Sequence, residues 1–355
     1  MRPIQARISI DAMAHNLRVA RRHSGTAQVF AVVKANAYGH GLSRALRAFA
    51  AADGFAVLTL EEAANLRMMG VEQPIMLLEG LFGPDEIATC AELDLWPVLH
   101  HASQLDWLEH QPPARPIRVF LKLDSGMHRL GFPLADHAAV VARVNSLPAI
   151  ADLTLMTHFA QADDAVGVSW QLKPFLDVVS IHGLPWTSAN SAALMRYPDA
   201  QGMLTRPGIM LYGATPYADQ SAAELGLKPA MTLQSEIISV QTVQPGEGVG
   251  YGLLFRAEKT MRVGVVACGY ADGYPRHALT GTPVLVNGHP SRTLGRVSMD
   301  MLCVDLTDCG DVGVGAPVVL WGEGMPVDDV AAAAGTNGYE LLCALAARVP
   351  VEEVD

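Results

Sequence analysis

One lysine stands at the point where an apolar run of the chain ends, and it is the first candidate for covalent chemistry. Residues 28–33 form a short, β-branched run typical of a buried parallel strand, and residues 39–52 have the Leu and Ala spacing of a helix. Lys34 would therefore lie at the carboxyl end of a strand, where α/β barrels and open α/β sheets bind their ligands. By itself, a lysine at such a position is more often a solvated surface residue.

A serine and two backbone amides further along the chain have the character of a phosphate site. Ser191 follows the seventh predicted strand, and a proline suited to open a helix precedes Gly208 and Ile209. Barrels commonly hold phosphate with the loops after strands seven and eight and with a helix N-terminus. Taken alone, Ser191 suits a helix cap better, but its combination with Lys34 favours phosphate. No GxGxxG or P-loop pattern competes with this interpretation.

Other polar residues follow the remaining predicted strands and would ring the same mouth of the molecule. Lys122 ends the fifth strand, with Arg129 shortly after it. His158 follows the sixth strand and Arg206 the eighth. Each has an ordinary structural explanation: His158 fits a satisfied core histidine, and Arg129 fits an ion pair with Asp124 or another carboxylate.

The elements that must position these residues alternate regularly between strand and helix. Repeated βα units imply a parallel sheet, and eight of them close naturally into a (β/α)8 barrel. The predicted strands span residues 28–33, 54–58, 75–78, 95–99, 117–122, 152–157, 184–188 and 203–206. We assign residues 1–227 to this barrel.

The regular alternation of strand and helix patterns ends at about Gly226. Short Val-rich segments separated by Gly, Pro, Asn and Asp are typical of antiparallel strands, and Asn287-Gly288 is a hairpin turn signal. Only residues 327–334 and 338–349 have a helical pattern there. We assign residues 228–355 to a second, mostly β domain.

Composition bounds the possible functions. The 355 residues suffice for two domains, and 50% hydrophobic with 17% charged residues describes a well-cored soluble protein rather than a disordered or membrane-bound one. The net charge of −11 argues against nucleic acid as a partner. The five cysteines lack CxxC spacing, which favours a reduced, cytoplasmic protein without disulfides or a metal site.

Several motifs spread over nearly the whole chain resemble the alanine racemase family. They include AVVKANAYGHG at 31–41, KLDSGMHRLG at 122–131, RPGIMLYG at 206–213 and GRVSMDM at 295–301. The resemblance implies a pyridoxal 5'-phosphate (PLP) enzyme that interconverts L- and D-alanine, as a homodimer with composite active sites. Such an activity would serve either D-alanine supply for the cell wall or L-alanine catabolism.

The resemblance also implies roles for individual residues. Lys34 is similar to the lysine that binds PLP covalently and serves as one base, and Tyr251 to the second catalytic base. Arg206 resembles the arginine facing the pyridine nitrogen, and His158 the imidazole that links this arginine to the tyrosine. The implied phosphate ligands are Tyr38, Ser191, Gly208, Ile209 and Tyr339. Arg129 and the Met299 backbone N–H resemble the substrate-carboxylate site, and Lys122 a lysine that is carbamylated in many members.

Racemisation itself explains why such a set is needed. Inverting an α-carbon removes a proton from one face and returns one to the other, so two acid/base groups must flank it. A tyrosine has an ordinary pKa near 10 and is a poor base at neutral pH unless the phenolate is stabilised. We expect a cationic relay of Arg206 and His158 to provide this stabilisation.

Rival interpretations stay open at this point. Another PLP enzyme on the same barrel, such as a basic amino-acid decarboxylase or a serine or broad-specificity racemase, would share many of these residues. A PLP carrier made of the barrel alone is the non-enzymatic alternative. The β domain with Tyr251 argues against the carrier, and carbon dioxide release would distinguish a decarboxylase.

Overall fold

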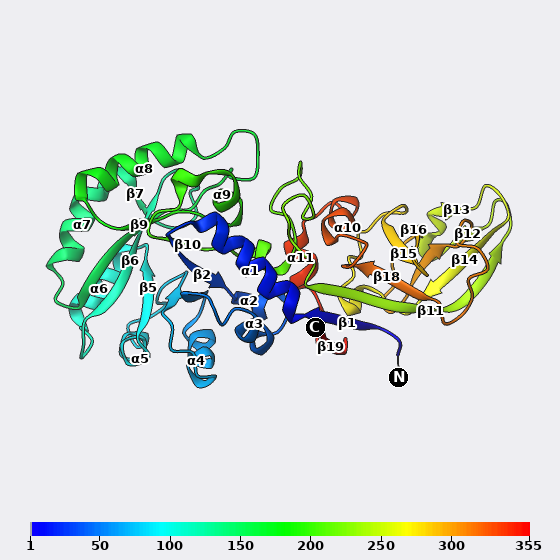
Figure 1. The fold of residues 1–355 in the computed structure, drawn as a ribbon, viewed down its shortest axis with the longest axis horizontal. Coiled ribbons are helices and arrows are strands. Elements are labelled where there is room, and N and C mark those ends of the chain that lie inside the picture. Colours follow the sequence, from blue (N-terminus) through cyan, green and yellow to red (C-terminus); the bar gives the residue numbers. More distant parts are fainter. Residues whose placement is uncertain (1) are drawn as a thin grey trace.

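The first large unit of the chain is a parallel barrel, seen in a computed structural model that describes residues 2–355 (Figure 1). Eight strands lie in the order β10-β2-β3-β4-β5-β6-β8-β9, with parallel pairing between neighbours. The ring closes where the Met203 N–H donates to the Trp186 carbonyl at 2.8 Å and the Arg206 N–H to that of Ala189 at 2.9 Å. The predicted (β/α)8 architecture is confirmed.

The barrel strands are short and mostly buried, because helices cover their outer faces. They are β2 (Gln28–Val32), β3 (Gly54–Val57), β4 (Ile75–Leu77), β5 (Leu95–Leu99), β6 (Ile117–Asp124), β8 (Ile150–Met156), β9 (Trp186–Thr187) and β10 (Leu204–Thr205), with β7 (Phe132–Pro133) beside β6. The alternating helices are α3 (Leu42–Ala48), α4 (Leu60–Met68), α5 (Glu86–Glu92), α6 (Ala102–His110), α7 (His137–Ser146), α8 (Ser169–His182) and α9 (Ser191–Arg196).

The second unit is built on an eight-stranded, mostly antiparallel sheet. Its longest strand, β11 (Met231–Val243), pairs with β18 through its first half and with β14 through its second, and each of these pairings contains one register shift. The predicted turn Asn287-Gly288 joins β15 to β16. The further elements are β14 (Met261–Val266), β15 (Pro283–Val286), β16 (His289–Leu294), β17 (Leu302–Asp305), β18 (Pro317–Trp321), the hairpin β12 (Gly248–Val249) and β13 (Phe255–Arg256), and the helices α10 (Val327–Ala333) and α11 (Gly338–Cys343).

The first strand of the chain belongs to this second unit, not to the barrel. β1 (Gln5–Ser9) runs antiparallel to β11 and parallel to the C-terminal strand β19 (Val351–Val354). The assignment of all residues from 1 to 227 to the barrel therefore differs from the observed topology at its start. Alternating burial along β1 is visible in the sequence, but its pairing partners are distant in the chain and local periodicity does not reveal them.

Helix α1 (Ile10–Ser24) follows β1 and leads from this sheet to the barrel (Figure 1). The first strand therefore belongs to the second unit, and the first helix connects the two units. The hairpin β12–β13 lies at the end of the molecule farthest from the barrel (Figure 1). Within residues 2–355, none of the helices combines the length and the apolar character that crossing a membrane requires.

Candidate active site

A single large cavity opens at the carboxyl ends of the barrel strands. Its volume is about 840 Å³, and its wall contains ten of the twelve residues singled out in the sequence. These ten are Lys34, Tyr38, Lys122, Arg129, His158, Ser191, Arg206, Gly208, Ile209 and Tyr339. Tyr251 and Met299 do not line it.

Lys34 enters this cavity from an unusual turn of the chain. It follows the end of β2 and begins the short segment α2 (Lys34–Tyr38), whose residues 35–38 have φ angles of 51–54°. Left-handed conformations cost roughly 1–2 kcal/mol for each non-glycine residue, and such outliers cluster at functional sites. Two side chains hold the turn: Glu62 accepts the Ala35 N–H at 3.0 Å, and Asn36 accepts the Leu42 N–H at 3.0 Å.

The environment of Lys34 favours its unprotonated amine. The side chain is half-buried. Burial, followed by the positive charge of Arg129, lowers the pKa of Lys34 below the ordinary lysine value. An unprotonated lysine is both a nucleophile toward carbonyl groups and a base, so the position suits covalent and proton-transfer chemistry.

A compact cradle of hydroxyls and backbone amides lies beside Lys34. The Gly208 N–H donates to Ser191 Oγ at 2.9 Å, and the Tyr38 hydroxyl lies so close to Gly208 that a Cβ there would be 2.5 Å from it. Helix α9 begins at Ser191, but its N-cap is Asn190, whose Oδ1 accepts the Ala193 N–H at 2.9 Å. Ser191 is therefore free of the capping role that it would otherwise suit. Hydroxyl and amide donors converging in this way form an anion site.

The C-terminal part of the same chain closes one side of this cradle. Tyr339, on α11, has its ring centroid 6.1 Å from that of Tyr38. Gly39, directly after the lysine turn, packs so tightly on α11 that a Cβ would lie 2.2 Å from the Leu342 carbonyl oxygen. Asn337 caps the N-terminus of α11 and thereby fixes the position of Tyr339 in the first turn of this helix. The loop that precedes Tyr339 therefore allows this side chain to lie in the cavity wall.

Arg206 is a buried cation held by neutral oxygens. Its guanidinium donates to Thr187 Oγ1 and to the Thr157 and Ser188 carbonyls, the latter two at 3.0 Å. Burial lowers its pKa to about 9, so the group stays protonated near neutral pH. Because these partners carry no negative charge, Arg206 contributes a full positive charge to the cavity.

The pKa of His158 is lowered in this structure, which disfavours the cationic form that the expected relay with Arg206 requires. Burial and then the charges of Arg206 and Lys122 place the pKa of His158 well below its ordinary value. An imidazole among cations loses its proton because both desolvation and like charge disfavour the ionised form. The positive charge that could stabilise a nearby phenolate is therefore that of Arg206 and the other cations of the cavity rather than that of His158.

In the loop after β6, Asp124 pairs with His128 and not with Arg129, which differs from the ordinary structural role considered for Arg129. Asp124 accepts from the Gly126 and His128 N–H groups and from the His128 ring at 3.0 Å, and Arg129 is left exposed at the cavity wall. Lys122 lies behind it, buried, with a pKa lowered to about 8 by burial and by the charges of Arg206 and Arg129. Arg129 is therefore available to bind an anion in the cavity.

Tyr251 and Met299 are on the surface of the second unit, 71% and 53% exposed. Tyr251 follows the hairpin strand β12, at the far end of the molecule from the barrel (Figure 1). The single chain therefore brings together the cofactor-type residues and leaves these two apart from them.

Sequence reasoning missed residues both in the cavity wall and in the layer beneath it. Glu79 is the only carboxylate among the described residues of its wall, and it follows β4 as Lys34 follows β2, so the same strand-end rule would have found it. Tyr212 lies under the cradle, stacked on Tyr38 at a centroid distance of 4.7 Å with its hydroxyl donating to the Val32 carbonyl.

Comparisons with known proteins find relatives over the whole length of the chain. Residues 8–216 match the family model "Alanine racemase, N-terminal domain", and residues 230–353 match "Alanine racemase, C-terminal domain". The chain is 75% identical to an alanine racemase of Thiobacillus denitrificans, over 100% of this chain and 96% of the relative. The crystal structure of the biosynthetic alanine racemase from Pseudomonas aeruginosa superposes with a TM-score of 0.97 at 49% identity, covering 100% of both chains. An Acinetobacter baumannii alanine racemase gives a TM-score of 0.92 at 38% identity.

Proposed function

The chain belongs to the alanine racemase family, and on that premise we propose how its residues interconvert L-alanine and D-alanine. The enzyme is an isomerase. We propose that it binds PLP on Lys34 and uses two bases, Lys34 of one subunit and Tyr251 of the other. The observation that carries the proposal is the cavity in which a lysine of lowered pKa, an anion cradle and a buried arginine converge.

The residues of the cavity fit PLP. Tyr38, Ser191, Gly208, Ile209 and Tyr339 would hold its phosphate, because they supply hydroxyls and backbone N–H groups around a space that a Cβ at 208 would obstruct. Arg206 would hold the pyridine nitrogen, since its charge has no carboxylate to neutralise it. When bound, PLP supplies the electron sink that makes the α-hydrogen of alanine acidic.

Arg206 also limits side reactions. A guanidinium at the ring nitrogen, unlike a carboxylate, discourages protonation of the ring and so weakens the electron sink. Proton return at the α-carbon is then favoured over transamination, because less charge is delocalised away from that carbon.

Lys34 serves one face of the α-carbon. Lys34 Nζ would accept or return the proton at this face, and its lowered pKa favours the free amine that this role requires. Arg129 would bind the substrate carboxylate together with the Met299 N–H, which orients the α-hydrogen between the two bases.

Tyr251 serves the opposite face, from a second subunit. Its exposure and its place beyond β12 support a composite site, because its own chain holds it away from the cavity of Lys34. In a head-to-tail homodimer, each β domain would cover the barrel mouth of its partner. Arg206, acting through the neutral His158, would stabilise the phenolate.

Lys122 is proposed to be carbamylated. Carbon dioxide adds to unprotonated amines, and a pKa lowered to about 8 leaves a substantial unprotonated fraction near neutral pH. The resulting negative carbamate would orient the neighbouring Arg129. We also propose a cytoplasmic location, which the five free cysteines support.

Chiral analysis of alanine tests the whole proposal. The purified, PLP-loaded protein should convert either pure enantiomer toward an equal mixture. Release of carbon dioxide from lysine or arginine without interconversion of alanine would replace the proposal with a decarboxylase, and faster conversion of serine than alanine would change the substrate.

A further inference from the structure

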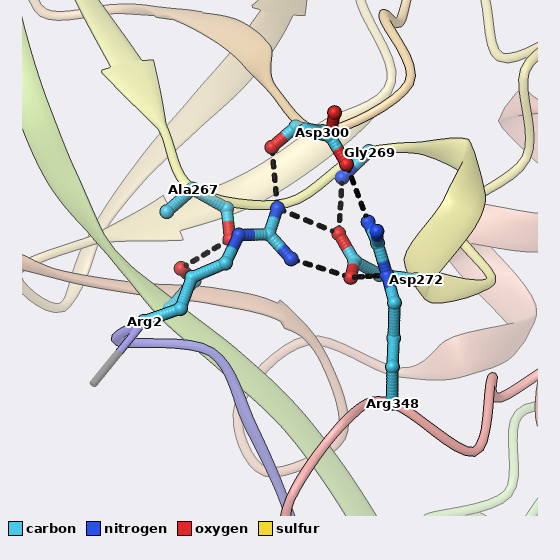
Figure 2. Close-up of polar contacts among 7 residues, drawn as sticks. Arg2, Ala267, Gly269, Asp272, Asp300 and Arg348 are labelled. Carbon is cyan, nitrogen blue, oxygen red and sulfur yellow. Dashed lines mark hydrogen bonds and ion pairs between the residues drawn. The ribbon is translucent and has the colours of Figure 1, made fainter.

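A completely buried carboxylate in the β domain joins both ends of the chain. The Asp272 side chain is 0% exposed and forms ion pairs with Arg2 at 2.5 Å and with Arg348 at 2.8 Å. Figure 2 shows the two guanidinium groups meeting it from opposite sides. Arg2 uses both terminal nitrogens, one to each carboxylate oxygen, so the pair is bidentate.

The same two arginines also hold a neighbouring loop. Arg2 donates to the Asp300 carbonyl oxygen, and Arg348 donates to Asp300 Oδ1 at 2.7 Å (Figure 2). Asp272 in turn accepts the Gly269 N–H at 2.9 Å, which fixes the turn on which it lies. We name Arg2, Asp272, Asp300 and Arg348 the Asp272 cluster.

Backbone hydrogen bonds connect this turn directly to Met299. The Tyr270 N–H donates to the Ser298 carbonyl and the Ala271 N–H to the Met299 carbonyl, both at 3.0 Å. The contact needs glycine at 269, because a Cβ there would lie 2.3 Å from the Ser298 oxygen and 2.4 Å from the Met299 oxygen. Met299 and Tyr270 are themselves exposed, so a turn anchored by the buried Asp272 carboxylate supports a solvent-facing loop.

This series of close backbone contacts continues to the segment before Tyr251. A Cβ on Gly295 would lie 2.7 Å from the Val249 carbonyl oxygen, and one on Gly250 would lie 3.7 Å from that of Arg296. Residues 295–299 therefore connect the Asp272 cluster with the backbone that leads into Tyr251.

We propose that Asp272 is a positioning residue for the active site of the partner subunit, where it sets the place of the Met299 N–H that receives the alanine carboxylate. The inference rests on the proposed composite site. Burial alone would raise the pKa of Asp272, but hydrogen bonds from Arg2, Gly269 and Arg348 hold it below the ordinary value, so the cluster keeps its charge at neutral pH. Ion pairs of this kind contribute little net stability compared with apolar packing, whereas they fix orientation.

The first test is the kinetics of Asp272→Asn, which keeps the shape and removes the charge. The KM for alanine should rise about tenfold while kcat changes by less than about twofold, because binding in the ground state and the transition state is lost equally. Arg348→Lys, which keeps the positive charge, should have a smaller effect than Arg348→Met. Asp305→Asn is the matched control, since it removes another arginine-paired aspartate of the β domain that does not contact the 269–272 turn.

The second test uses two heterodimers that contain the same substitutions in different arrangements, each purified through two affinity tags. In the first, Lys34→Ala and Asp272→Asn are on the same chain and the partner is unaltered, so the only working site uses the altered β domain and its KM should be raised. In the second, the two substitutions are on separate chains, so the working site is intact and its KM should be normal. Any loss of folding is common to both arrangements and cannot create this difference.

The outcomes separate the inference from the proposed function. An unchanged KM in the Asp272→Asn homodimer overturns the positioning role and leaves the composite site untouched. A raised KM in the second heterodimer with a normal KM in the first overturns the composite site, because Asp272 would then act on the cavity of its own chain.

Discussion

The hydroxyl of Tyr38 lies against the backbone of Gly208 so closely that a Cβ at position 208 would be 2.5 Å from it. The contact joins a side chain of the lysine turn to the backbone amides that follow β10. A residue larger than glycine at position 208 should therefore affect cofactor binding.

Gly208→Ala should weaken PLP binding by about 10- to 100-fold, because relieving the overlap displaces Tyr38 at a cost of roughly 1–3 kcal/mol. The backbone angles at 208 are φ −120° and ψ −93°, which lie outside the main regions allowed to residues with a Cβ, so backbone strain in alanine adds to this effect. Gly313→Ala is the control, since a Cβ at 313 meets nothing within 4 Å. Titration of each apoprotein with PLP measures the effect, and equal affinities would contradict the assigned cradle.

Lys34 should carry the cofactor covalently, because it is the lysine of lowered pKa beside the cradle. Reduction of the holoenzyme with borohydride followed by peptide mapping should find the pyridoxyl group on Lys34. A label on Lys122, the other lysine of the cavity wall, would transfer the role to that residue.

Lys34→Ala and Tyr251→Ala proteins should each be inactive, and mixing them under conditions of subunit exchange should restore part of the activity. Recovery is expected because one of the two sites in each heterodimer then has both an intact lysine and an intact tyrosine. Native mass spectrometry verifies the exchange. Absence of recovery in verified heterodimers would place Tyr251 in the site of its own chain.

Tyr251→Phe should reduce racemisation by about 100- to 10,000-fold, the usual contribution of a positioned acid/base group. If Lys34 serves the D-face, as the family resemblance implies, deuterium from heavy water should still enter D-alanine much faster than L-alanine. Mass spectrometry of the separated enantiomers measures this. Near-normal racemisation with equal exchange would favour a one-base mechanism.

His40 should make the stability of the apoprotein depend on pH. Burial lowers its pKa to about 4, while Nδ1 contacts the Ala37 and Tyr38 carbonyls of the lysine turn. The unfolded chain, with a histidine pKa near 6.5, binds the proton first as pH falls, so stability is lost between about pH 6.5 and pH 4, by as much as about 3 kcal/mol. Urea unfolding should show a shallower pH slope for His40→Gln, and identical slopes would contradict the assignment.

Local features of the sequence predict much of the barrel and of its ligand-binding mouth. The strands at residues 28–33, 54–58, 75–78 and 95–99 agree with the observed ones to within one residue, because buried parallel strands are short apolar runs whose ends are marked locally. Lys34, Ser191 and Gly208 could be placed together from the chain alone, since the carboxyl ends of parallel strands meet at one mouth.

Other features depend on residues that are distant in the chain and follow only from the folded structure. The strand β1 pairs with β11 and β19, and Arg2 meets Arg348 at Asp272. Both contacts join segments that are far apart in the chain, and local periodicity carries no information about such contacts. The neutral state of His158 likewise follows from desolvation and from the cations that the fold gathers around it. The separation of Tyr251 from the cavity of its own chain is a property of the assembled domains, because only their packing fixes which way each surface faces.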